Sequence, residues 1–169
     1  MKKSFCLITL VLFSSQLVFS QKTPIQPTMK ADMEFLASDA LEGRGTGSEG
    51  EHKAALFIID RFSQLGLQAK GDSGWFQKFT YVPHGGMQKH QVGDSTKMGM
   101  QLVKEIIGHN VIGYLDFGKE NTIIIGAHYD HIGKIAAVNG DDIANGANDN
   151  ASGTTSVSEV AKYFAKAKS

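Results

Sequence analysis

The chain has 169 residues, which is enough for one domain, and carries 17 Lys and Arg residues against 17 Asp and Glu residues. This balance, without a stripe of basic residues interleaved with aromatic ones, argues against nucleic acid as a partner. Cys6 is the only cysteine, so an intramolecular disulfide framework is excluded.

The first twenty residues are predicted to be a signal peptide. Lys2 and Lys3 precede an apolar run over residues 5–13 that is too short to span a bilayer. Cleavage after Ser20 would remove Cys6 and two lysines, leaving residues 21–169 with a net charge of about −2. We therefore expect a secreted or periplasmic protein with no membrane attachment after signal cleavage.

Two helices are expected next. Thr28 is predicted to cap a helix that contains Met33 and Leu36, and a glycine-rich segment over residues 43–50 ends it. A second helix is predicted from about Ser48 to Leu65, with Gly66 placed to terminate it. Its apolar residues follow the three-four spacing of a core-facing stripe and are Ala54, Ala55, Ile58, Ile59, Phe62 and Leu65.

The middle of the chain predicts strands. Residues 75–82 alternate aromatic and polar types, which is typical of an edge or antiparallel strand. Residues 83–99 are expected to be a loop, in which His84 and His90 lack the spacing of metal ligands. Residues 122–127 form a continuous β-branched run, which is typical of a strand buried on both faces in a sheet covered by helices. The fold class predicted is therefore α/β.

Candidate functional residues follow this apolar run. Open α/β sheets bind ligands at the carboxyl ends of their strands, where His128 and Asp130 emerge. Side chains two apart on a strand point the same way, so Asp130 could accept the ring N–H of His128 while the other ring nitrogen binds a metal. An H-x-D triplet is also common where a histidine only caps a strand end. Asp149 strengthens the metal hypothesis, because its Gly- and Asn-rich loop opens directly into a helical pattern. His131 is expected to line the pocket or cap the loop and not to bind metal.

Two paired motifs carry a family resemblance. Residues 126–130 read Gly-Ala-His-Tyr-Asp, and residues 146–153 read Gly-Ala-Asn-Asp-Asn-Ala-Ser-Gly. They resemble the G-A-H-x-D and G-A-[DN]-D-[DN]-x-S-G signatures of the co-catalytic di-zinc exopeptidases. That family includes secreted bacterial aminopeptidases, and its fold is shared by glutaminyl cyclases and the transferrin receptor ectodomain. Residues 35–50 and 110–113 also resemble the N-terminal half of the family.

The resemblance implies roles for three residues. His128 would be a terminal ligand of one zinc ion, Asp149 the carboxylate that bridges two zinc ions, and Asp130 the catalytic-site residue that orients His128. The preference of zinc for imidazole and carboxylate ligands agrees with these roles. The implied fold is a doubly wound mixed sheet with flanking helices. The implied activity is that of a zinc-dependent aminopeptidase, which hydrolyses the N-terminal bond of a peptide substrate.

The resemblance also implies ligands that this sequence does not contain. In the family, the general-base glutamate, a neighbouring glutamate ligand, a further aspartate and a late histidine all follow the helix that here ends near Lys168. We therefore expect residues 21–169 to be the N-terminal portion of a C-terminally truncated catalytic domain, with a partial sheet and no activity of its own. Two alternatives stay open: a glutaminyl cyclase-like zinc enzyme, and a non-catalytic peptide-binding remnant of the same fold.

Overall fold

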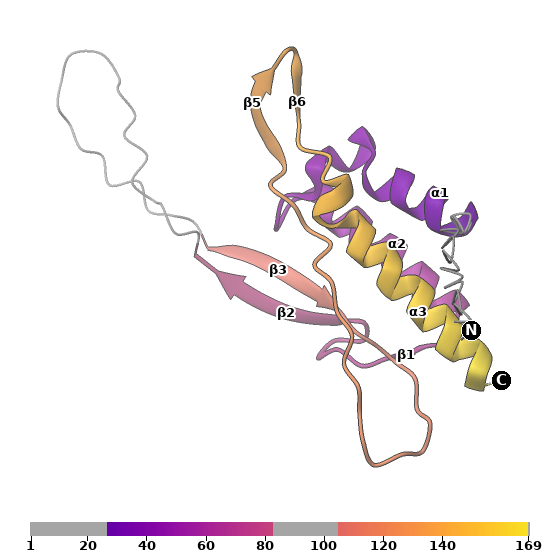
Figure 1. Cartoon of the computed structure of the whole chain (residues 1–169). Coiled ribbons are helices and arrows are strands. Elements are labelled where there is room, and N and C mark those ends of the chain that lie inside the picture. The colour runs from indigo at the N-terminus through magenta and orange to yellow at the C-terminus, as the bar shows by residue number, and fades with distance from the viewer. Residues whose placement is uncertain (1–26, 83–104, 169) are drawn as a thin grey trace, which may run out of the picture.

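The computed structural model describes residues 27–82 and 105–168, drawn in colour in Figure 1. The predicted signal peptide and the predicted loop with His84 and His90 lie outside these residues. In chain order, the elements are α1 (Pro27–Leu36), the 3-10 segment η1 (Asp39–Arg44), α2 (Glu49–Gln64), β1 (Gln68–Ala69), β2 (Phe76–Tyr81), β3 (Ile106–Val111), β4 (Gly113–Tyr114), β5 (Lys134–Val138), β6 (Asp141–Ile143), the π-type turn η2 (Ala147–Ala151) and α3 (Ser152–Lys168).

Helix α2 confirms the predicted second helix. The Ser48 hydroxyl accepts a hydrogen bond from the Glu51 N–H at 3.2 Å, which satisfies one of the free donors of the first turn. Gly66 has a φ of +74°, the left-handed conformation that ends a helix. Four residues of the predicted stripe, Ala54, Ala55, Ile58 and Phe62, are buried, whereas Ile59 and Leu65 are half-buried.

Helix α1 begins earlier than predicted. It starts at Pro27, whose fixed φ and missing N–H suit the first helical position, so Thr28 lies inside the helix and is not its cap. The Thr28 hydroxyl instead donates to the Glu159 carboxylate at 3.1 Å and links α1 to α3.

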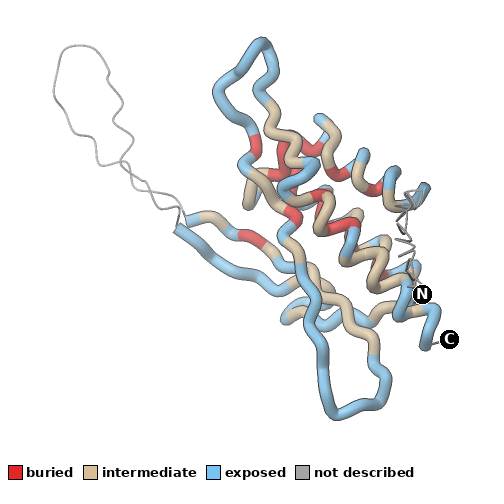
Figure 2. The backbone as a smooth tube through the Cα atoms, in the orientation of Figure 1, coloured by how far each residue is buried: buried red, intermediate tan, exposed pale blue. Residues whose placement is uncertain are grey.

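The core lies where the helices meet the segment around residue 129. Buried residues, red in Figure 2, concentrate on the facing sides of α1 and α2 and on the chain between them. Helix α3 contacts both α1 and α2. The core cluster consists of Leu36, Leu41, Ala54, Ala55, Ile58, Phe62, Tyr129 and Ala151.

The strands form three small antiparallel pairs, β1 with β4, β2 with β3, and β5 with β6. Strand β2 confirms the prediction for residues 75–82, and it pairs with β3 in a register that runs from Phe76 opposite Val111 to Tyr81 opposite Ile106. The fold is thus a mixture of helices with small antiparallel sheets. Among the described residues, no helix is long and apolar enough to cross a membrane.

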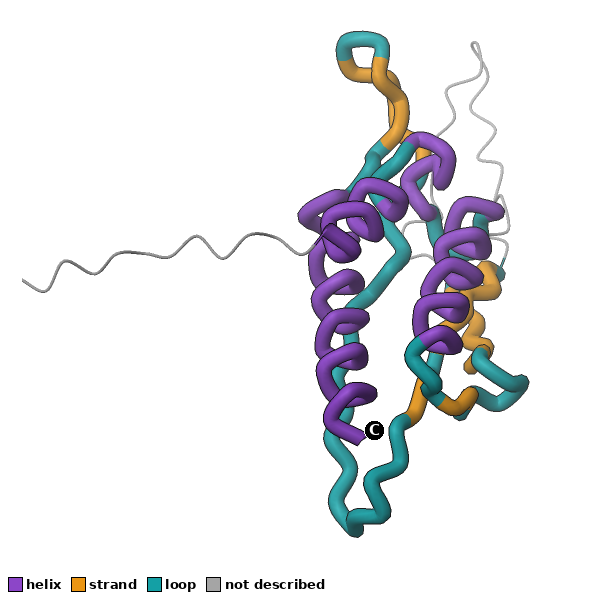
Figure 3. The backbone as a smooth tube through the Cα atoms, turned by 90° about the vertical axis from the view of Figure 1, so that its right-hand side faces the viewer, coloured by secondary structure: helices purple, strands orange, loops and turns teal. Residues whose placement is uncertain are grey.

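The prediction of a strand over residues 122–127 is wrong, because the structure forms no strand there. They lie in the long loop at the bottom of Figures 1 and 3, and Ile123 and Ile124 are 82% and 92% exposed. A strand exists only where a neighbouring strand pairs with its N–H and C=O groups, and the described residues place none beside this run. The described strands accordingly form no doubly wound sheet.

Candidate metal centre

Two segments distant in sequence lie side by side at the site. The His131 N–H donates to the Arg44 carbonyl at 2.9 Å, and the Gly133 N–H donates to the Gly43 carbonyl at 3.0 Å. Gly45 and His131 form an isolated parallel bridge. The segment that follows the apolar run is therefore held in an extended conformation against the glycine-rich turn before α2.

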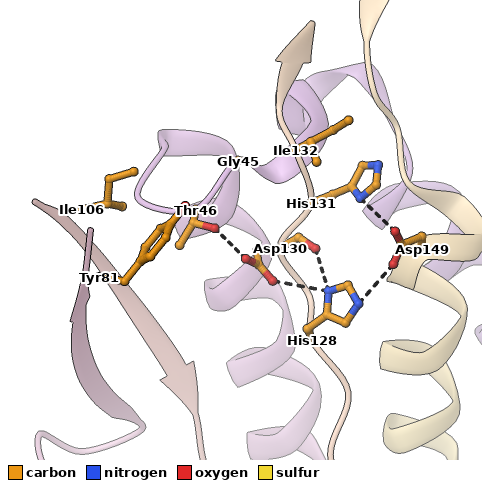
Figure 4. Close-up of a pocket in the computed structure, with 9 residues that line it drawn as sticks. All are labelled: Gly45, Thr46, Tyr81, Ile106, His128, Asp130, His131, Ile132 and Asp149. Atoms are coloured by element: carbon orange, nitrogen blue, oxygen red, sulfur yellow. Dashed lines mark hydrogen bonds and ion pairs between the residues drawn. The ribbon is translucent and has the colours of Figure 1, made fainter. Parts of the chain in front are cut away.

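This extended backbone separates two kinds of side chain. Tyr129 is buried in the core, whereas His128 and Asp130 on either side of it line a cavity. Alternation along an extended segment puts the two neighbours of a buried residue on the opposite face. The predicted shared face of His128 and Asp130 is present (Figure 4).

The His128 ring is oriented by Asp130. Its Nδ1 lies 3.1 Å from the Asp130 backbone carbonyl and 3.4 Å from Asp130 Oδ1, so the Nδ1–H donates mainly to the carbonyl. The second carboxylate oxygen of Asp130 accepts a hydrogen bond from the Thr46 hydroxyl at 2.6 Å. A proton on Nδ1 leaves the lone pair of Nε2 free for a metal.

Asp149 faces this imidazole from the loop before α3. Its Oδ1 lies 3.1 Å from His128 Nε2, and its Oδ2 lies 3.6 Å from His131 Nδ1. Asp149 has non-helical backbone angles within η2, and the peptide bond that follows it is cis. The cavity beside these groups has a volume of about 500 Å³ and is lined by Gly45, Thr46, Tyr81, Ile106, His128, Asp130, His131, Ile132 and Asp149 (Figure 4).

Arg44 connects the two segments of the site and was not predicted. Its side chain is fully buried, and its guanidinium donates to the carbonyls of Tyr129 at 2.6 Å, Asn145 at 2.8 Å and Gly146 at 2.9 Å, and to that of Leu36. One planar cation thus joins the end of α1, the His128–Asp130 segment and the loop that carries Asp149. In the sequence, the only feature that could have indicated the role of Arg44 is its position between two glycines.

The charge of Arg44 also acts on the site. Burial lowers the pKa of the Arg44 guanidinium below its ordinary value, while the nearby Asp130 and Asp149 carboxylates oppose this change. An arginine nevertheless stays protonated in proteins. Arg44 therefore places a permanent positive charge behind the two carboxylates.

Glu51 is a second residue that the sequence analysis missed. It is 3% exposed, and its carboxylate accepts from the Gly47 N–H at 2.6 Å, the His109 N–H at 3.3 Å and the Tyr129 hydroxyl at 3.1 Å. The Tyr129 hydroxyl also contacts the His109 carbonyl. Tyr129 is thereby anchored to α2 and β3, which fixes the backbone between His128 and Asp130.

The buried phenol predicts a loss of stability at alkaline pH. Burial, followed by the charge of Glu51, raises the pKa of Tyr129 above its usual range, so the folded chain keeps a proton that the unfolded chain releases near pH ~10. The contribution of the protonated Tyr129 to the free energy of unfolding is fully present below that pH. It falls as pH rises further, by up to about 1.4 kcal/mol per pH unit. We expect Tyr129→Phe to remove this slope in urea unfolding between about pH 9 and 11, whereas Tyr81→Phe, at an exposed position, should keep it. Equal slopes in wild type and Tyr129→Phe would contradict the prediction.

The side chains of the site come together in pairs. Within residues 27–82 and 105–168, no group of three His, Cys, Asp or Glu side chains is placed to hold one metal ion. The pairs are His128 with Asp149 and His131 with Asp149. Imidazole nitrogens and carboxylate oxygens, which line this open cavity, are donor types that zinc accepts.

A family comparison covers the segment that carries these residues. Residues 110–169, roughly the last third of the chain, match the model of Peptidase family M28. The resemblance to the co-catalytic zinc exopeptidases is confirmed over this segment, which contains His128, Asp130 and Asp149, and the match associates it with peptidases. No curated protein and no solved structure matches the chain significantly.

Proposed function

We propose that this chain carries metal-binding residues of a zinc-dependent aminopeptidase, with His128 and Asp149 as zinc ligands and Asp130 as the residue that orients His128. The observation that carries the proposal is the approach of His128 Nε2 to Asp149 Oδ1, at 3.1 Å, within the segment that matches the peptidase family.

The donor set fits zinc. Ligand bonds of about 2.0–2.2 Å in a tetrahedral site put the donor atoms of two neighbouring ligands about 3.4 Å apart. The separation of 3.1 Å between His128 and Asp149 is close to this value, so a small movement would let both donors bind one ion. The Asp149 side chain is 69% exposed, which leaves room for water or substrate beside it.

Each residue of the site would have its own role beside a bound zinc ion. Zinc bound here would supply a Lewis acid and lower the pKa of its bound water. Asp130 holds the proton of His128 on Nδ1, and Thr46 holds Asp130 in place. Tyr81 and Ile106 give the cavity an aromatic and aliphatic wall, which suits a side chain of a bound peptide.

The fold and the cellular location belong to the same proposal. We propose that residues 122–127 are a strand of a doubly wound mixed sheet whenever neighbouring strands pair with them, since Ile123 and Ile124 are otherwise exposed to water. Residues 1–20 would act as a signal peptide that directs the protein to the periplasm or outside the cell. Peptides are the proposed substrates.

Alanine substitutions at the two ligands test the proposal. We expect His128→Ala and Asp149→Ala each to abolish stoichiometric zinc binding, measured by metal analysis after dialysis, together with any hydrolysis of an amino-acid anilide. Asp130→Asn should weaken zinc binding roughly ten- to hundredfold, because it changes only the support of a ligand. His52→Ala, at an exposed position of α2, is the matched control and should leave zinc binding unchanged.

The outcomes separate the two parts of the proposal. Zinc retained by His128→Ala or Asp149→Ala would contradict the ligand role of that residue. Zinc binding by the wild type without anilide hydrolysis would support the metal site and count against aminopeptidase activity of this chain.

A further inference from the structure

The tip of the β5–β6 hairpin carries an Asn-Gly pair. Asn139 and Gly140 form the two-residue turn between Val138 and Asp141, and the hairpin projects away from the helices (Figure 1). Both turn residues are exposed, and their φ angles of +55° and +88° are those of a type I′ turn. We propose that Asn139 is a site of spontaneous deamidation, at which the backbone nitrogen of Gly140 attacks the side-chain amide of Asn139.

The reaction needs water as its only co-reactant. A bond forms between the Gly140 nitrogen and Asn139 Cγ, the bond from Cγ to Nδ2 breaks, and the proton of the Gly140 N–H leaves with the amide group as ammonia. Water then opens the resulting succinimide ring at either of its two carbonyls. Opening at Cγ gives aspartate, whereas opening at the backbone carbonyl gives isoaspartate, in which the main chain runs through the former side chain.

Little hinders the attack by the Gly140 nitrogen. Glycine carries no side chain, and beyond the adjacent residues no atom lies within 4 Å of the position that a Cβ would take. Among residues 27–82 and 105–168, none forms a hydrogen bond with the side-chain amide of Asn139. The remaining barrier is the closed turn itself, which must open locally before the nitrogen can reach Cγ.

Local opening of this hairpin is expected to require little free energy. All five residues of β5 are exposed, and the pairing with β6 is irregular between Lys134 and Val138. A two-stranded hairpin without a packed face is only marginally stable in water. Weakly packed elements of this kind open without unfolding of the core. The turn therefore samples the conformations in which the attack can occur.

A second Asn-Gly pair, Asn145-Gly146, provides an internal comparison. Asn145 Nδ2 donates to the Ala37 carbonyl at 2.9 Å and to Asp39 Oδ1 at 2.7 Å. The backbone carbonyl of Asn145 accepts from the Arg44 guanidinium at 2.8 Å. Forming the succinimide at Asn145 would first break these hydrogen bonds, so we expect its deamidation to be at least about tenfold slower than that of the turn residue.

Peptide mapping by mass spectrometry tests the inference on the full chain. A protease that cleaves before aspartate separates the two positions, because it yields residues 130–140 and residues 142–148. After incubation of the folded chain in water labelled with 18O, we expect the label in the first peptide, as aspartate and isoaspartate at position 139. The rate should rise with pH, because the attacking nitrogen must lose its proton. The second peptide should keep the Asn145 amide over the same time.

Two controls separate the effect of the fold from that of the Asn-Gly pair. In concentrated urea, Asn139 and Asn145 should lose their amides at similar rates, because each is then followed by an unhindered glycine. Asn139→Gln should abolish the modification at that position, since a longer side chain forms its ring more slowly, and far-UV circular dichroism would verify that this variant folds. If the folded chain keeps the Asn139 amide, or loses it no faster than that of Asn145, the inference is overturned. The proposed function would stand in either case, because none of its residues lies in this turn.

Discussion

Replacing Arg44 by methionine is expected to lower the free energy of unfolding by about 3–5 kcal/mol, the largest effect on stability that we expect of any single substitution. The substitution removes the donors that pair with four buried or half-buried carbonyls, including those of Tyr129, Asn145 and Gly146. The methionine side chain fills part of the space but has no hydrogen-bond donor for these carbonyl oxygens. Urea denaturation followed by circular dichroism measures the change.

A matched control separates this effect from the loss of a positive charge. Lys134 forms an ion pair with Glu42 at 2.6 Å, and both side chains are about half exposed. Lys134→Met therefore removes one cation with little or no loss of stability, since exposed ion pairs contribute little. Arg44→Lys should fall between the two, because one ammonium group, with three N–H donors, cannot pair with four carbonyls in the directions of a planar guanidinium. Equal stabilities of Arg44→Met and Lys134→Met would refute the structural role of Arg44.

Replacing Glu51 by alanine is expected to cost about 2–4 kcal/mol of folding free energy. The carboxylate is almost fully buried and accepts from Gly47, His109 and Tyr129. Its removal leaves the Gly47 and His109 N–H groups without this acceptor and the Tyr129 hydroxyl with only the His109 carbonyl. It also leaves a cavity between α2 and β3. Thermal and urea unfolding of Glu51→Ala measure the effect.

Glu49 supplies the comparison for Glu51. Both glutamates lie in the first turn of α2, where a negative charge stabilises the helix N-terminus, but Glu49 is exposed. The difference between Glu49→Ala and Glu51→Ala therefore isolates the buried hydrogen bonds. In the double variant with Tyr129→Phe, the two losses should not add, because both substitutions remove the same hydrogen bond. Additive losses would indicate that Glu51 and Tyr129 act independently.

Local patterns account for the parts of the structure that could be predicted. Helix α2 followed from its three-four apolar spacing, its Ser48 cap and Gly66, all of which act within a few residues. Strand β2 followed from alternation in the same way. The common face of His128 and Asp130 depends only on the two-residue period of an extended backbone.

The failure at residues 122–127 has a non-local cause. An apolar β-branched run predicts burial, but burial requires neighbouring strands and covering helices that the run itself does not contain. In the described structure the run has no strand beside it, and its isoleucines face water. An apolar run can therefore indicate that a segment suits a buried strand, but it does not supply the neighbouring strands that would bury it.

The sequence by itself indicated the candidate site residues, because His128, Asp130 and Asp149 lie in two short motifs whose spacing is local. Only the tertiary structure decided what holds those residues and what else faces them. Arg44 meets three of its four carbonyl partners 85 to 102 residues later in the chain, and Thr46 meets Asp130 after 84 residues. The direction of His131 toward Asp149 likewise depends on the packing of its ring over Gly146. A polar side chain can pair with many groups, so its partner is selected by the folded positions of segments far apart in sequence.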